Sequence, residues 1–235
     1  DIPNPNHFAN VATSGGGISI LSTQLLTNSD FLTGAFPAEY GNALSGVFDL
    51  NLRKGNNEKR EYTIQAGFLG IDLAAEGPFS KNYNGSYLIN YRYSTLAVLT
   101  KFGLEVGEGV TAFQDLSYNF HFPTKKSGSF SLFGFGGLSS DKLDAEKDSS
   151  SWESEDDRYN YDFVSNTGAA GLRHAITLSP DTYLQSAILV SGNDQGDVAE
   201  RLDENYAAQP EYRANHINKK VTVSSVLNHK FNARH

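Results

Sequence analysis

The chain has 235 residues, of which 39% are hydrophobic and 12% aromatic, and its formal net charge is −8 at pH 7. This apolar content is enough to bury a core and excludes a disordered chain, while the acidic balance argues against nucleic acid as a partner. Cysteine is absent, which excludes disulfides and thiolate metal sites.

Residues 1–57 form a short first unit that is rich in turn residues. It contains a break at Ser14-Gly15-Gly16-Gly17, strand candidates at 18–20, 31–33 and 47–53, and a stretch at 22–28 that fits either one helical turn or a loop. A unit this small and interrupted cannot bury a core alone. We therefore expect it to be held inside a larger structure. The chain has no methionine, not even at position 1, so we expect it to be a piece of a longer protein.

From residue 58 the chain changes to longer segments in which apolar and polar residues alternate. The alternation is clearest at 87–94, where Tyr87, Ile89, Tyr91 and Tyr93 share one face. The pattern predicts eight consecutive antiparallel strands, at residues 62–69, 71–79, 86–96, 112–122, 129–138, 161–178, 182–191 and 221–231. The opposite face is polar, and we expect it to be lined by Asn90, Arg92, Asp115, Asn119 and His121.

Short and long connections alternate between these strands. Those at 80–85, 123–128 and 179–181 are short, whereas those at 97–111, 139–160 and 193–220 are long and polar. This sorting is typical of an outer-membrane barrel, with tight periplasmic turns and long outer loops. Six aromatic residues near the short turns fit an interfacial girdle, although aromatic residues also simply favour strands: Phe79, Tyr87, Phe120, Phe122, Phe130 and Tyr183. The sequence contains no run of 18 apolar residues, so it predicts no membrane-spanning helix.

Three stretches of the first unit resemble the TonB-dependent outer-membrane receptors, most closely those of Bacteroidetes. They are Asn4-Pro5-Asn6-His7-Phe8, the glycine break, and above all TGAFPAEYGNALSGVFDL at residues 33–50. In that family the last stretch is similar to the end of the plug, the folded domain that occupies the barrel. The resemblance implies an all-β transmembrane antiparallel β-barrel, partial with about eight strands. Residues 1–57 would be the C-terminal part of the plug and 58–235 the N-terminal part of the barrel.

The resemblance also has departures. Many members carry Arg-Gly-Pro where this chain has Thr33-Gly34-Ala35, so a charged contact through that arginine is not expected. The family's TonB box is absent from the sequence, and the remaining barrel strands must come from sequence outside it. The charged residues that we expect at plug–barrel contacts are Glu39, Arg53, Arg92 and Asp115.

The function implied by the resemblance is TonB-dependent active uptake of a ligand across the outer membrane of a Gram-negative cell. The expected partners are TonB, through a segment absent here, the outer-membrane lipids, an unidentified transported ligand and, as an open question, a surface lipoprotein. The long loops would be extracellular and the short turns periplasmic. Two alternatives stay open: a passive porin-like or surface ligand-binding barrel, and a soluble β-sandwich binding module.

The sequence carries no motif that predicts an enzyme, a cofactor or a metal centre. There is no nucleotide-binding glycine motif, no G-x-S-x-G, and the six histidines are scattered. The acidic run at 141–157 lacks EF-hand spacing, so a solvated loop is favoured over a Ca²⁺ site. Trp152, Tyr159 and Tyr161 flank this run and are the ligand-loop candidates, for a sugar or a cation. The alternative is a loop packed on its own neighbours.

Overall fold

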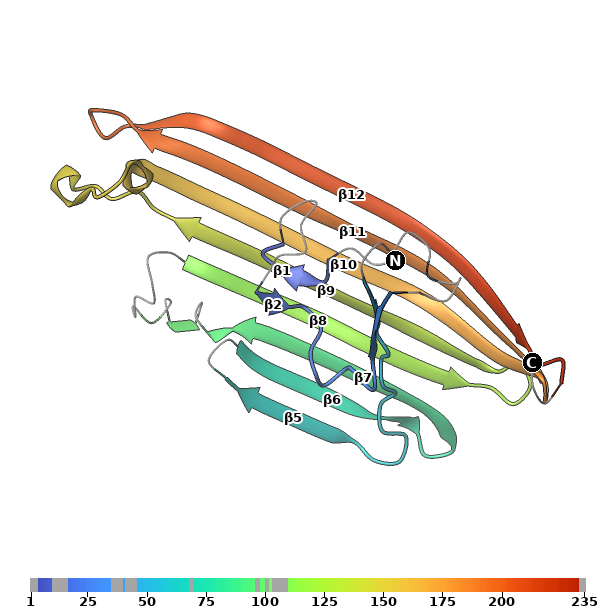
Figure 1. Ribbon diagram of the computed structural model, residues 1–235. Coiled ribbons are helices and arrows are strands. Elements are labelled where there is room, and N and C mark those ends of the chain that lie inside the picture. The colour runs from blue at the N-terminus through green and yellow to red at the C-terminus, as the bar shows by residue number, and fades with distance from the viewer. Residues whose placement is uncertain are drawn as a thin grey trace.

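The computed structural model describes residues 4–9, 17–34, 40, 46–67, 70–95, 98–99, 102 and 110–232. Its main feature is one eight-stranded antiparallel sheet in the order β12-β11-β10-β9-β8-β7-β6-β5. Figure 1 shows the sheet as a long curved layer with β5 at one edge and β12 at the other. The all-β class and the pairing of each strand with the next, both expected from the alternation, are therefore confirmed.

The strands lengthen along the chain. Strand β5 has 6 residues, whereas β10 and β11 have 21 each and β12 has 22. The sheet is open, and its two edges differ strongly in length. The bounds are β5 Glu61–Ala66, β6 Gly70–Ser80, β7 Tyr83–Ser94, β8 Val110–Pro123, β9 Ser129–Leu143, β10 Tyr159–Ser179, β11 Thr182–Leu202 and β12 Ala208–His229.

The long connection expected at 193–220 is wrong. Strand β11 continues to Leu202 and β12 begins at Ala208, so only residues 203–207 connect them. The reason is that this part of both strands is polar on both faces, for example at Asn193, Asp194 and Gln195. Period-2 alternation of apolar residues vanishes where neither face is apolar, and the segment then resembles a loop.

Side chains alternate between the two faces of the sheet, and the two faces have different surroundings. In β7, Leu88 and Asn90 are both 0% exposed, whereas Ile89 and Tyr91 are 37% and 36% exposed. The alternation expected at 87–94 is therefore confirmed. We call the side that carries Leu88 and Asn90 the buried face, and the side that carries Ile89 and Tyr91 the exposed face.

The exposed face is covered with large apolar side chains. Antiparallel partners share a face, so the strand register extends the set from Ile89 and Tyr91 across the sheet. The exposed members are Tyr62, Ile64, Leu73, Ile89, Tyr91, Leu116, Leu132, Leu138, Leu172, Ile188, Val190, Ile217, Val221 and Val223. Such a continuous apolar surface is unusual on a protein face that meets water.

Aromatic side chains gather on the exposed face near the short turns. The ring of Phe79 stacks on Phe122 at 5.0 Å between centroids and also contacts Tyr87 and Phe120. Phe130 stacks on His174 at 4.5 Å. Tyr183 was grouped with this set, but it lies an odd number of residues from Ile188 in β11 and therefore points to the other side of the sheet.

The described residues between 4 and 53 form short elements in front of the sheet (Figure 1). Strand β1 (Asn6–His7) pairs with β2 (Ile18–Ser19), and β3 (Asp30–Thr33) pairs with β4 (Gly46–Asp49). The stretch at 22–28 forms a tight turn, in which the Leu25 amide donates to the Ser22 carbonyl at 3.0 Å. We call residues 4–9, 17–34, 40 and 46–53 the N-terminal segment.

The β9–β10 connection contains two short 3-10 turns, η1 (Ser149–Ser151) and η2 (Glu155–Arg158). Turn η2 begins with a capping box between Ser154 and Asp157, which satisfies the free amides at its start. Within the part of the chain that the structure describes, no helix is long and apolar enough to cross a membrane.

Candidate functional site

The candidate site is the contact between the N-terminal segment and the buried face of the sheet. Strand β1 lies against β9 and β10. Buried polar residues are concentrated on this face, among them Asn90, Asp115, Ser117, Ser139 and Ser165. Charged and polar groups are retained in such places when partners satisfy them, so the pairs across this contact decide what the site can do.

The centre of the contact is a buried carboxylate, Asp115 of β8. Its Oδ2 atom receives hydrogen bonds from His7 Nε2 at 2.9 Å and from Arg92 Nε and Nη2 at 2.9 and 2.7 Å. The side chains of His7 and Asp115 are 0% exposed. Arg92 also donates to the Ser19 carbonyl. Arg92 and Asp115 of the sheet thus bind both strands of the β1–β2 pair, through His7 and Ser19.

A second charged contact lies where the N-terminal segment joins the sheet. The guanidinium of Arg53 makes two parallel hydrogen bonds to the carboxylate of Glu76 in β6, at 2.8 and 2.7 Å, while its Nε donates to the Gln24 carbonyl. The Asn56 amide donates to the same carboxylate at 2.7 Å. A bidentate Arg–carboxylate pair fixes orientation as well as position, so it sets the angle at which the chain enters β5.

The contact is not held by polar groups alone. Ile20 and Leu21 pack with Phe135, Ala169 and Leu189 of β9, β10 and β11 in one buried apolar cluster. Leu26 and Leu50 of the segment are partly buried and pack against this cluster. The contact therefore combines a small apolar cluster with buried charged pairs.

Two neighbouring glycines in β9 provide a matched test of this packing. A methyl group on Gly137 would lie 2.6 Å from the His7 ring and 2.8 Å from Ile20, whereas one on Gly136 would meet nothing closer than 3.5 Å. We expect Gly137→Ala to weaken docking of the N-terminal segment by about 1–3 kcal/mol, the usual cost of overpacking. Gly136→Ala should leave it unchanged.

Hydrogen exchange of residues 4–9 and 17–26 measures this docking. Equal exchange in the two glycine variants would contradict the described packing of His7 and Ile20 on β9.

Of the charged residues expected at this contact, three lie in its charged pairs: Arg53, Arg92 and Asp115. Glu39 lies outside the described residues. Sequence reasoning missed His7 and Glu76. His7 was set aside as one of six scattered histidines, and nothing in its local pattern signals a partner 108 residues away.

The ligand-loop candidates lie at the long-connection end of the sheet. Trp152 is engaged within its own loop: its indole Nε1 donates to the Glu146 carbonyl at 2.8 Å, and the guanidinium of Arg158 lies 5.0 Å from its ring centroid. Tyr159 and Tyr161 stack on each other at 5.6 Å on the same side of β10 as Ser165. The two tyrosines thus project from the buried-face side of the sheet, beyond the N-terminal segment.

The β9–β10 loop is joined to the β11–β12 connection. Trp152 and Tyr206 have ring centroids 6.1 Å apart, and the Tyr206 hydroxyl donates to Ser149 at 2.8 Å. Glu155 accepts from Arg201 at 2.9 Å and from Arg158 at 3.5 Å. The acidic run is therefore an ordered loop packed on its neighbours. Among the described residues, no group of three His, Cys, Asp or Glu side chains is placed to hold a metal ion.

This loop contact should depend on pH. The hydrogen bond from Arg201, helped by Arg158, lowers the pKa of Glu155 from its ordinary 4.5. The contribution of these ion pairs is then complete above pH 4.5 and is lost as the pH falls through the lower pKa of the folded protein. Trp152 is the only tryptophan of the chain and lies against Arg158. We expect its emission to change below pH 4.5, and Glu155→Gln to abolish that change.

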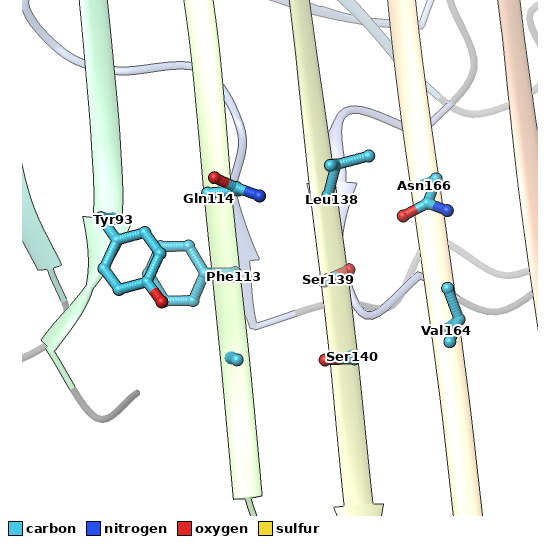
Figure 2. Close-up of a pocket in the computed structure, with 9 residues that line it drawn as sticks. Tyr93, Phe113, Gln114, Leu138, Ser139, Ser140, Val164 and Asn166 are labelled. Atoms are coloured by element: carbon cyan, nitrogen blue, oxygen red, sulfur yellow. The ribbon is translucent and has the colours of Figure 1, made fainter. Parts of the chain in front are cut away.

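Two shallow hollows lie on the exposed face of the sheet. One, of about 180 Å³, crosses four strands: Figure 2 shows Tyr93, Gln114, Leu138 and Asn166 on β7, β8, β9 and β10 in turn. The other, of about 530 Å³, shares Leu138 and Asn166 with the first and has four glycines in its lining: Gly136, Gly137, Gly168 and Gly192. No charged side chain lines the first hollow. Neither hollow brings together side chains that suggest a chemical reaction.

Comparisons of the chain with protein-family models, with curated proteins and with solved structures found no match.

Proposed function

We propose that this chain is part of a plug-gated β-barrel of the Gram-negative outer membrane that takes up a ligand with TonB. The observation that carries the proposal is that the covered and exposed faces of the sheet are the reverse of those in a soluble protein. The polar face is covered by the N-terminal segment, whereas the apolar face is exposed. A soluble protein would cover the apolar face first, since burying it gives the largest gain.

The apolar face suits contact with lipid. A membrane barrel alternates lipid-facing apolar residues with inward polar ones, and carries aromatic residues where the apolar band ends. Ile188, Val190 and Leu172 would lie in that band, and the cluster around Phe79 would lie at its periplasmic border. The soluble β-sandwich is disfavoured because its apolar face would have to be packed on a second sheet.

The occupied interior argues for a barrel larger than eight strands. An eight-stranded barrel has room inside only for side chains or one small ligand, whereas here a chain segment with four short strands lies on the inner side. The edges also do not match, since β5 has 6 residues and β12 has 22. We infer that further strands, outside this sequence, pair with β12 and β5 and close the barrel.

The N-terminal segment is then the end of the plug, and its contacts favour a gated transporter over a passive pore. Two charged pairs, Arg53–Glu76 and His7–Asp115, connect the plug to the barrel strands at separate places. Hydrogen-bonded pairs lose their strength over a short displacement, so a pull from the periplasm can open them without disturbing the strand ladders. TonB would supply that pull, and the outer loops would form the entrance for the ligand.

Conductance in planar bilayers separates the two barrel readings. The full-length protein should show no steady current, and removal of residues 1–53 should produce one, because the segment occupies the interior. A steady current through the intact protein would instead support the passive porin. Binding of the purified TonB periplasmic domain to the full-length protein would then test the coupling.

The lipid contact has its own test, because the chain has no cysteine that would need removal. Spin labels at residues 188 and 190 should collide often with oxygen and rarely with a water-soluble nickel chelate. A label at Val198, on the same face of β11 but nearer the long connections, should show the opposite. Preference for the nickel reagent at 188 and 190 would refute a lipid-facing surface.

A further inference from the structure

The turn that follows β1 has an unfavourable backbone conformation. Among the described residues other than glycine, Phe8 and Tyr206 have positive φ angles, 57° and 61°. An L-residue in this left-handed region brings its Cβ too close to the backbone, and phenylalanine has no polar side-chain atom to compensate locally. Phe8 lies in the candidate site, directly after His7, whereas Tyr206 lies in an exposed connection.

Three strands of the sheet hold this turn in place. The Phe8 amide donates to Ser139 Oγ of β9 at 3.2 Å, and Ser165 Oγ of β10 donates to the Ala9 carbonyl at 3.1 Å. Ser139 in turn donates to the Ser165 carbonyl at 2.6 Å, which fixes its hydroxyl. Both serines are 3% exposed. Asp115 of β8 holds the adjacent His7.

The conformation of Phe8 is thus imposed by strands β8, β9 and β10 of the sheet and not by its own neighbours in sequence. A strained residue persists only while its surroundings determine its conformation. Once the bonds to Ser139 and Ser165 open, the backbone can relax to an ordinary conformation. Relaxation then favours the open state and opposes rebinding.

We propose that His7–Phe8–Ala9 is a release turn: it stores backbone strain while docked and is the first part of the N-terminal segment to detach from the sheet. Its role in gating rests on the proposed function, whereas the strain itself does not. Tyr161, one of the ligand-loop candidates, projects from the same side of β10 as Ser165, four residues nearer the long connections.

The test compares Phe8→Gly with Phe8→Ala in the full chain purified in detergent. Both variants remove the ring, and only glycine removes the cost of positive φ. Hydrogen exchange of residues 4–9, in conditions where it reports the opening equilibrium, should be about fivefold slower in the glycine variant. If the glycine variant exchanges as fast as the alanine variant, or faster, Phe8 stores no strain and the proposal is wrong.

Tyr206→Gly and Tyr206→Ala are the matched controls, since they change the same kind of strain at a place with no contact to the segment. They should alter exchange only around residues 203–207 and in the β9–β10 loop, where Tyr206 contacts Ser149 and Trp152. The order of release is read from the unmodified protein: residues 4–9 should exchange faster than the Arg53–Asn56 junction, and the reverse order overturns the proposal. Neither measurement uses ligand or TonB, so a failure of transport would leave both results standing.

Discussion

Replacing Ile188 by arginine should destabilise the membrane-inserted protein by about 2–4 kcal/mol, the cost of an arginine at the lipid-facing midplane of a barrel. Ile188 is 47% exposed in β11, between Leu172 of β10 and Val223 of β12 in the strand register. If this face met water, an arginine there would be nearly neutral, because exposed surface substitutions usually change stability by less than about 0.5 kcal/mol. The size of the loss in stability therefore shows whether this face meets lipid or water.

Val198→Arg is the matched control. It changes the same residue class on the same strand and face, ten residues nearer the long connections, where the proposed band has ended. We expect it to cost at most about 1 kcal/mol. Unfolding of the full-length protein from lipid vesicles with denaturant measures both. Equal, small effects of the two substitutions would contradict a lipid-facing surface on β11.

The sequence predicts the sheet well wherever one face is apolar. Residues 87–94 alternate clearly, and β7 was expected within three residues of its observed bounds. The prediction failed where both faces are polar, at the ends of β11 and β12 around Asn193 and Lys219, because alternation is then invisible. The same physical cause shortened the expected β9 and β10, whose ends run up to the acidic loop.

The candidate site could be predicted only in part. Arg92 and Asp115 were expected to face inward because alternation fixes their side of the strand, and the structure places them against His7 and Ser19. Their partners could not be derived, because pairing between residues 7 and 115 depends on how the segment docks. The left-handed conformation of Phe8 was equally hidden, since no glycine or asparagine signals it.

The largest effect on the docked segment is expected from Asp115→Ala. This substitution leaves Arg92 and the buried His7 without their shared partner, and breaking a buried charged pair costs about 3–5 kcal/mol. Arg92 retains some access to water, with 18% of its side chain exposed, so we expect the lower end of that range. Exchange of residues 4–9 and 17–26 should then be at least about 100-fold faster.

Two further variants separate docking from folding of the sheet. Asp141→Ala removes an exposed carboxylate on the same side of the sheet, which accepts a hydrogen bond from Thr111, and should change exchange little. His7→Ala leaves the Arg92–Asp115 pair intact within the sheet, yet should still open the segment, by about 1–3 kcal/mol. Because His7 lies outside the eight strands, its effect cannot come from a misfolded sheet. If neither Asp115→Ala nor His7→Ala speeds exchange, the charged contact does not hold the segment, and the gate would have to depend on the apolar cluster around Ile20 instead.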